Sequence, residues 1–131
     1  MLVYLWLAVG GALGTIARYW INGVVSRHFE SFPMGTLVIN VTGSFIIAFF
    51  AGLTAPEGRL LVNPNVRLFF MTGVCGGYTT FSSFSLQTLE LARDGEWFYA
   101  GANVVGSFVL CLLAAWLGYI AALSLKPTKG L

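Results

Sequence analysis

Four long apolar segments occupy most of this chain, and each is long enough to cross a lipid bilayer. They lie at about 2–24, 35–55, 66–91 and 97–125. A spanning helix needs about 20 mostly apolar residues, and helices satisfy all of their backbone groups in hydrocarbon without closing into a barrel. The sequence therefore predicts an all-α membrane protein, with residues 1–131 forming a single domain of four transmembrane helices.

The composition agrees with residence in a membrane. The chain is 57% hydrophobic and 9% charged, whereas soluble domains are about 25% charged. Its net charge of +2 comes without a basic cluster, so we expect the lipid bilayer and not a nucleic acid as its surroundings. The N-terminus lacks the basic region of a signal peptide. Cys75 and Cys111 lie in apolar segments without the spacing of a disulfide framework or a metal site.

The orientation of the helices is weakly specified by charge. Four spans place both termini on one side, which carries Arg59, Arg67, Lys126 and Lys129; the other side carries Arg27 and Arg93, with Arg18 inside the first span. Cytoplasmic loops normally hold a clear excess of Lys and Arg. The slight bias fits either cytoplasmic termini or dual topology, in which copies insert in both orientations.

Small residues four apart suggest close helix packing. Gly10 and Gly14 form one such pair, and Ala102 and Gly106 form another. This spacing lets membrane helices approach closely, within one subunit or between subunits. Four helices enclose little space, so we expect the chain to function as an oligomer.

Polar residues recur along single faces of three predicted helices. Thr36, Asn40 and Ser44 are four apart; Asn103, Ser107 and Cys111 are also four apart; Ser82 and Ser85 are three apart, as are Phe81 and Phe84. Any one of these residues is explained by a hydrogen bond to a neighbouring helix or to its own backbone. Three stripes in one short chain indicate a shared polar pathway.

The missing acids favour an anion over a cation or a proton in this pathway. No Asp or Glu lies inside a predicted span, apart from Glu90 at an end, whereas proton pathways and cation channels use acidic side chains. Hydroxyl and amide donors suit a small anion. Arg18 either attracts the anion or extends to the interface, and Phe81 and Phe84 either present positive ring edges to it or only pack.

The third span contains a Gly-Gly pair, Gly76 and Gly77. Each glycine weakens a helix by about 1 kcal/mol relative to alanine. A helix break at this depth frees carbonyl groups that coordinate alkali cations in transporters. Close packing of helices explains the pair equally well, and the residues alone leave both interpretations open.

Four segments together resemble the Fluc/CrcB family of fluoride channels. They are GGALGTIAR (10–18), GTLVINVTGSF (35–45), TGVCGGYTTFSSFS (72–85) and NVVGSF (103–108). The resemblance extends over all four spans, and the third-span motif is the most specific part of it.

The resemblance implies a dual-topology antiparallel homodimer in the cell (inner or plasma) membrane, with two pores that let cytoplasmic fluoride leave passively and so lower its toxicity. It implies a fluoride pathway formed by Phe81, Phe84, Asn40, Thr36, Ser82, Ser85, Ser107 and Arg18. It also implies a break in the third helix, where the backbone carbonyls of Gly76 and Thr79 hold a structural sodium ion at the dimer interface. Cys111 and Tyr78 depart from the residues frequent in this family.

Three other functions compete with this interpretation. A small multidrug-type exporter also has four helices, but it needs a carboxylate in its first helix, where this chain has only Arg18. A second alternative is that the chain is an accessory subunit of a larger complex, in which case the purified protein should conduct no ions. An enzyme is the weakest alternative, because the spans contain no acid–base pair.

Overall fold

The computed structural model describes residues 1–125, and their secondary structure is helical. Three helices are long and apolar enough to cross a membrane: α1 (Leu2–Ser26), α2 (Met34–Leu53) and α6 (Trp97–Ser124). They confirm the first, second and fourth expected spans as long apolar helices. The protein is therefore a multi-pass membrane protein.

The third expected span is built from several short segments. These are α3 (Pro64–Leu68), the π-helix η1 (Phe69–Cys75), α4 (Gly76–Tyr78) and α5 (Phe81–Arg93). Between α4 and α5 the backbone is extended, with φ −81° and ψ 157° at Thr79 and φ −152° and ψ 110° at Thr80. No continuous helix in this region therefore reaches the length of a span.

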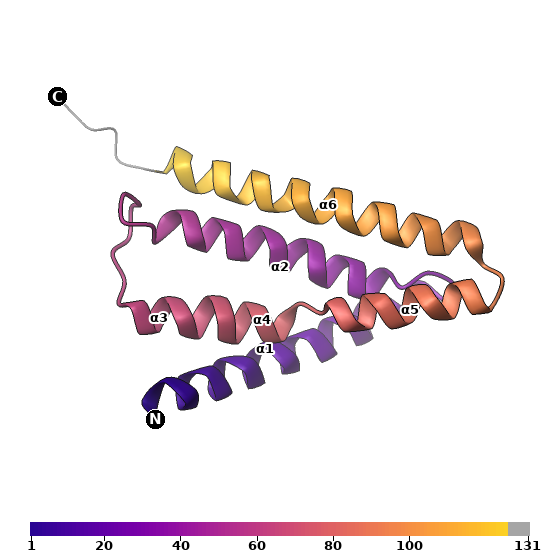
Figure 1. The fold of residues 1–131 in the computed structure, drawn as a ribbon, viewed down its shortest axis with the longest axis horizontal. Coiled ribbons are helices and arrows are strands. Elements are labelled where there is room, and N and C mark those ends of the chain that lie inside the picture. The colour runs from indigo at the N-terminus through magenta and orange to yellow at the C-terminus, as the bar shows by residue number, and fades with distance from the viewer. Residues whose placement is uncertain (126–131) are drawn as a thin grey trace.

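The segments from α3 to α5 follow one another along the molecule beside α2 (Figure 1). Helix α2 lies between this row and α6, whereas α1 packs mainly against η1 and α4. The N-terminus and the end of α6 lie at the same end of the molecule, as an even number of crossings requires. Lys126 and Lys129, which entered the charge count, lie outside the described residues.

Glycines let α1 approach the third row closely. A Cβ atom placed on Gly10 would lie 2.7 Å from the Phe69 carbonyl oxygen and 3.0 Å from Gly73 Cα. A Cβ on Gly14 would lie 2.7 Å from the Tyr78 amide nitrogen. Packing within one subunit thus explains the first pair of small residues, whereas a Cβ placed on Gly106 of the second pair would meet no other segment within 4 Å among residues 1–125.

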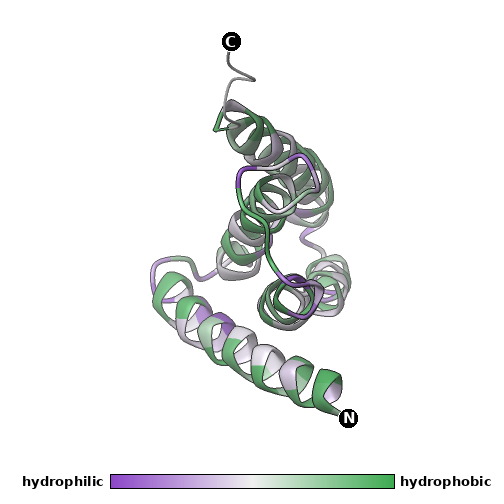
Figure 2. Cartoon of the chain, turned by 90° about the vertical axis from the view of Figure 1, so that its left-hand side faces the viewer, coloured by the Kyte–Doolittle hydropathy of each residue, from purple (hydrophilic) through white to green (hydrophobic). Residues whose placement is uncertain are grey.

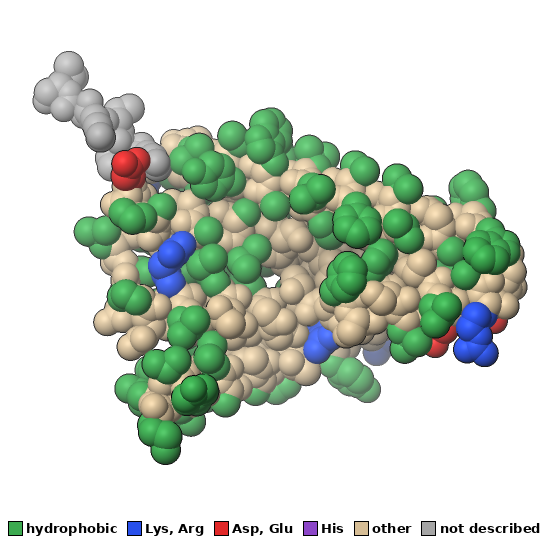
Figure 3. Space-filling model, in the orientation of Figure 1, with side chains coloured by type: hydrophobic (Ala, Val, Ile, Leu, Met, Phe, Trp, Pro, Cys, Tyr) green, Lys and Arg blue, Asp and Glu red, His purple; other side chains and the backbone are tan. Residues whose placement is uncertain are grey.

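Hydrophobic side chains cover the outside of the molecule. Residues such as Phe98 and Leu112 are 82% and 70% exposed, and apolar residues run along every long helix (Figure 2). In the space-filling view, acidic side chains are visible only at the two ends of this face (Figure 3). An exposed apolar surface bounded by charged ends is the pattern of a protein surrounded by lipid.

Candidate functional site

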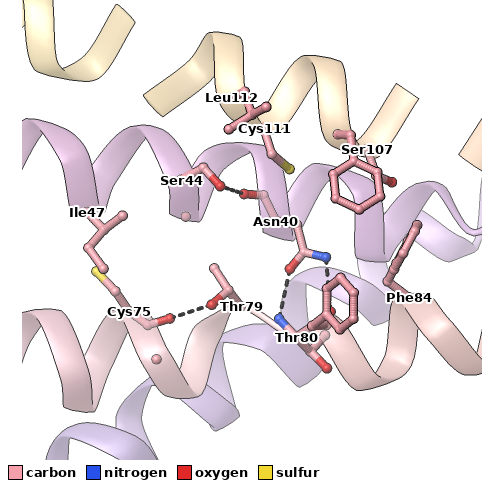
Figure 4. Close-up of a pocket in the computed structure, with 14 residues that line it drawn as sticks. Asn40, Ser44, Ile47, Cys75, Thr79, Thr80, Phe84, Ser107, Cys111 and Leu112 are labelled. Atoms are coloured by element: carbon pink, nitrogen blue, oxygen red, sulfur yellow. Dashed lines mark hydrogen bonds between the residues drawn. The ribbon is translucent and has the colours of Figure 1, made fainter. Parts of the chain in front are cut away.

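A cavity of about 300 Å³ lies in the middle of the molecule, between α2, the junction of α4 with α5, and α6 (Figure 4). We call it the central cavity. It is lined by Asn40, Gly43, Ser44, Ile47, Cys75, Gly76, Thr79, Thr80, Phe81, Phe84, Ser107, Phe108, Cys111 and Leu112. This described lining contains no charged side chain. It brings together six of the residues that the resemblance assigns to the fluoride pathway or the sodium site, namely Asn40, Gly76, Thr79, Phe81, Phe84 and Ser107, and two further members of the polar stripes, Ser44 and Cys111.

The two phenylalanines differ in how firmly the chain holds them. Phe84 is 7% exposed, and its ring meets Phe108 edge to face at a centroid distance of 6.0 Å and an angle of 86°. Phe81 is 68% exposed, although its ring centroid lies 5.4 Å from that of Phe84. Aromatic edges carry the positive part of the ring quadrupole. The pair forms an apolar wall of the cavity, of which Phe81 is the exposed part, and a ring edge turned to the cavity would make this wall weakly positive.

Asn40 is tied to the extended residues by two hydrogen bonds. The Asn40 Nδ2 group donates to the Thr80 carbonyl at 3.0 Å, and the Thr80 N–H donates to Asn40 Oδ1 at 2.8 Å (Figure 4). An amide NH₂ group has two donors. Asn40 therefore keeps one N–H beyond those engaged by Thr80, while its side chain is fixed between α2 and the α4–α5 junction.

The carbonyls of Gly76 and Thr79 are released from the usual helical pattern. In an α-helix each carbonyl accepts from the amide four residues later. Here the Thr80 N–H donates to Asn40, and the Ser83 N–H donates to the Thr80 hydroxyl at 3.1 Å. The N–H groups that would donate to these two carbonyls in a regular helix donate to side chains instead. The two carbonyl oxygens therefore fit the chemistry of an alkali-cation site.

The glycine pair itself does not form the interruption. Gly76 and Gly77 are helical within α4, and the extended backbone begins three residues later at Thr79. Both glycines are therefore helical, and the backbone leaves the helix beyond them. Gly77 allows close packing, since a Cβ on it would lie 2.5 Å from the Gly11 carbonyl oxygen, whereas Gly76 is exposed and a Cβ on it would meet only the Met71 carbonyl oxygen, at 3.9 Å.

A buried polar network links α5 to α6 beside the central cavity. Asn103 is 2% exposed and donates from Nδ2 to the Thr88 hydroxyl at 2.9 Å. Thr88 donates to the Phe84 carbonyl at 2.8 Å, and Ser107 donates to Asn103 Oδ1 at 3.4 Å. The network sets the position of the helix that carries Phe84 against the face of α6 that carries Ser107.

Two further cavities lie between the central cavity and one end of the molecule. The arginine cavity, of about 210 Å³, is lined by Thr15, Arg18, Tyr19, Asn22, Thr36, Ile39, Thr80, Ser83 and Gln87. The acidic cavity, of about 690 Å³, lies at the end of the molecule where α5 meets α6, and its lining includes Gln87, Glu30, Glu90, Asp94 and Glu96. Thr80 lines the first two cavities and Gln87 lines the last two. Together the three cavities form a series from the middle of the molecule to one end, which we call the route; its central member is lined mainly by apolar side chains, and the other two carry more polar groups.

Ser82 and Ser85 lie away from this route. Both are exposed and line none of the three cavities. The Ser85 hydroxyl donates to the Phe81 carbonyl at 3.0 Å. Spacing in the sequence placed these serines on the phenylalanine-bearing helix without showing that they point elsewhere.

Four polar residues of the site were not singled out from the sequence: Thr80, Ser83, Gln87 and Thr88. Thr80 had a signal, because a threonine directly before an apolar helix is a typical N-cap. Gln87 had none, yet its Oε1 atom is buried without a hydrogen-bond partner among the described residues.

The two departures from the family pattern are also located. Cys111 lines the central cavity as a free thiol. The Tyr78 hydroxyl lies 2.8 Å from the hydroxyl of Thr42 and forms a hydrogen bond with it. Tyr78 therefore attaches the end of α4 to α2, outside the cavity.

Comparison with known proteins identifies close relatives. A family model described as "CrcB-like protein, Camphor Resistance (CrcB)" matches residues 5–119. A protein of Opitutus terrae named "Fluoride-specific ion channel FluC" is 64% identical over 131 residues, covering 99% of each chain. Proteins of the same name from Methylocella silvestris and Rhodospirillum rubrum are 54% and 56% identical, covering 97% and 92% of this chain and 98% and 95% of their own.

Proposed function

This chain belongs to the CrcB family, and we propose that it is a fluoride-selective channel through which cytoplasmic fluoride leaves the cell passively. Its relatives are named as ion channels, so the family is not one of enzymes. The proposal places the protein in the cell membrane, with fluoride as its permeating ion.

The lining of the central cavity is the observation that carries this proposal. Fluoride is small and strongly hydrated, so a pore must replace its water with closely spaced donors. The cavity supplies the free N–H of Asn40, and its described lining holds no carboxylate. In the proposed pore the rings of Phe81 and Phe84 turn their edges to the ion, and the Ser107 hydroxyl exchanges its long 3.4 Å hydrogen bond to Asn103 for one to the ion. Neutral donors stabilise an anion without a fixed countercharge that would retain it.

Arg18 adds a positive charge to the route in the arginine cavity, which shares Thr80 with the central cavity. It lines the arginine cavity beside Thr36 and Gln87. A positive potential raises the local concentration of an anion. The membrane potential then provides the driving force, because an inside-negative potential favours exit by about 2.3 kcal/mol per charge per 100 mV.

The single chain leaves parts of the proposed pore open, which supports assembly with a second copy. Phe81 is 68% exposed and Gly76 is also exposed, although both line the central cavity. We propose an antiparallel homodimer in which the second copy closes this side. Antiparallel packing also brings the basic end of one copy, with Arg59 and Arg67, to the same side of the membrane as the acidic cavity of the other.

A structural sodium ion at the dimer interface is part of the same proposal. The Gly76 and Thr79 carbonyls would hold it, since their usual helical donors bond to Asn40 and Thr80. When bound, a cation supplies a fixed positive charge near the middle of the membrane. The protein's own residues contribute the extended backbone and the open face at Gly76.

Efflux of fluoride from proteoliposomes, with chloride efflux as the control, tests the proposed function. We expect fluoride efflux without chloride efflux from the unaltered protein. The Phe81→Ala/Phe84→Ala variant should lower it at least about tenfold, because the loss of about 1.4 kcal/mol of stabilisation at the barrier slows a rate by that factor.

Phe98→Ala is the matched control, since Phe98 is 82% exposed and lines none of the three cavities. It should retain efflux. Absence of fluoride efflux from the unaltered protein would contradict the channel function, and full efflux by the double variant would contradict the role of the two rings. Labelling a C-terminal cysteine from each side of the membrane tests dual topology, which labelling from one side only would reject.

A further inference from the structure

We propose that Asn40 is a positioning residue that keeps the Gly76 carbonyl free for a cation, and so couples the anion pathway to the cation site. This inference rests on the proposed sodium site. It goes beyond the expected role of Asn40 as a donor to the anion, because it assigns a separate task to the Oδ1 atom of the same side chain.

The geometry of the Asn40–Thr80 pair carries the proposal. The two hydrogen bonds, at 3.0 and 2.8 Å, join one side-chain amide to both backbone polar groups of a single residue 40 positions away. Thr80 is only 7% exposed, so its N–H and carbonyl need partners within the protein. Asn40 supplies both partners at once.

The acceptor that Asn40 provides replaces the Gly76 carbonyl. If α4 continued as a regular helix, the Thr80 N–H would donate to Gly76 four residues earlier. The ψ angle of Thr79 is 157°, far from the helical value of about −42°, and this rotation turns the Thr80 N–H away from Gly76. Bonding to Asn40 Oδ1 therefore stabilises the rotated state.

Removing that acceptor creates competition for the Gly76 carbonyl. A buried N–H without a partner is costly, so the chain gains by rotating Thr79 back and returning the Thr80 N–H to Gly76. The Gly76 carbonyl oxygen would then accept a hydrogen bond from Thr80 and would no longer be free to coordinate a cation. Loss of Asn40 Oδ1 should thus weaken cation binding even though Asn40 itself never contacts the cation.

A role of Asn40 as a simple link between α2 and the third row predicts something different. In that case its removal lowers stability to the same extent with or without sodium. The response of stability to sodium therefore separates the two roles. A ligand that binds the folded state raises stability by RT ln(1 + [L]/Kd), so the sodium-dependent rise in Tm reports the affinity directly.

The test measures the thermal unfolding of the purified full-length protein in detergent, in sodium and in a large organic cation at equal ionic strength. We expect about 100 mM sodium to raise the Tm of the unaltered protein, and Asn40→Leu to lose at least about half of that rise. Asn103→Leu is the matched control: it removes a second buried Asn, which bonds to Thr88 and Ser107 and not to Thr80. It should lower the baseline Tm and keep the sodium-dependent rise.

Asn40→Asp provides a second variant that keeps an acceptor for the Thr80 N–H. We expect it to retain the sodium-dependent rise in Tm while losing fluoride efflux, because its carboxylate places a negative charge in the wall of the anion pathway. If Asn40→Leu does not fold, Asn40→Asp alone tests the positioning role. Retention of the sodium-dependent rise in Tm then supports the proposal, and loss of that rise overturns it.

The outcomes separate this inference from the proposed function. A full sodium-dependent rise in Asn40→Leu overturns the positioning role and leaves both the channel and the sodium site standing. No rise in the unaltered protein overturns the sodium site and this inference together, while fluoride efflux from the same preparation still decides the channel function. An equal loss of the rise in Asn40→Leu and Asn103→Leu also overturns it.

Discussion

Replacing Gly10 with alanine should force α1 away from the third row of helices. The added Cβ would lie 2.7 Å from the Phe69 carbonyl oxygen, about 0.7 Å short of the 3.4 Å at which ordinary contact begins. It would also lie 3.0 Å from Gly73 Cα. Both obstacles are backbone atoms, so no side-chain rotation relieves the contact and whole segments must separate.

Overpacking of this kind costs about 1–3 kcal/mol, against a gain in helix propensity of up to about 1 kcal/mol for Gly→Ala. Gly23→Ala is the matched control, because Gly23 lies in the same helix and a Cβ placed on it would meet no other segment within 4 Å in the described part of the chain. Both variants gain the propensity term. The difference between their unfolding free energies should therefore equal the overpacking cost of about 1–3 kcal/mol.

Reversible unfolding in mixed micelles measures this difference, and fluoride efflux measures its functional consequence. We expect Gly10→Ala to lower efflux as well, because η1 leads directly into α4 and the extended residues. If Gly10→Ala proved as stable as Gly23→Ala, the contact between α1 and η1 would not be as close as described, and the packing argument would fail.

Three further predictions concern the polar groups. Ser107→Ala should slow fluoride efflux more than Ser85→Ala, since only Ser107 lines the central cavity; equal effects in a liposome assay would contradict the assignment. A double-mutant cycle of Asn103→Ala and Thr88→Ala should give a coupling of about 0.6 to 1.7 kcal/mol in unfolding experiments, and additive effects would show that the 2.9 Å hydrogen bond contributes nothing. Arg67→Gln should lower Tm without changing fluoride selectivity, because its side chain ties α3 to the end of α2; altered selectivity would place it on the pathway instead.

Much of the fold was predictable because membrane helices are specified locally. The length and apolarity of a segment decide whether it spans the bilayer, and α1, α2 and α6 follow the expected segments closely. The four-residue spacing of Asn103 and Ser107 likewise fixes their common face on any helix. Four-residue spacing also places Gly10 and Gly14 on one face of a helix, and the structure shows that this face packs against η1 and α4.

The site was predictable only as a set of residue types. Periodicity placed Ser85 beside the phenylalanines, yet its hydroxyl bonds to its own helix and lies outside the three cavities. No pattern in the sequence indicated Gln87, because it belongs to the site only by lining two cavities that other segments help to form. Contacts of this kind depend on how the helices are rotated against one another, which no single segment encodes.

The sequence by itself determined that this protein resides in the membrane, that its spans lack acids and that its polar residues form stripes, because these are properties of single segments in lipid. The tertiary structure decided where the third row stops being helical. Glycine propensity left open whether Gly76 and Gly77 break the helix, and the structure places the extended backbone at Thr79 and Thr80. The physical reason is that the Asn40 side chain on α2 bonds to the Thr80 peptide, a contact that exists only once the helices have packed.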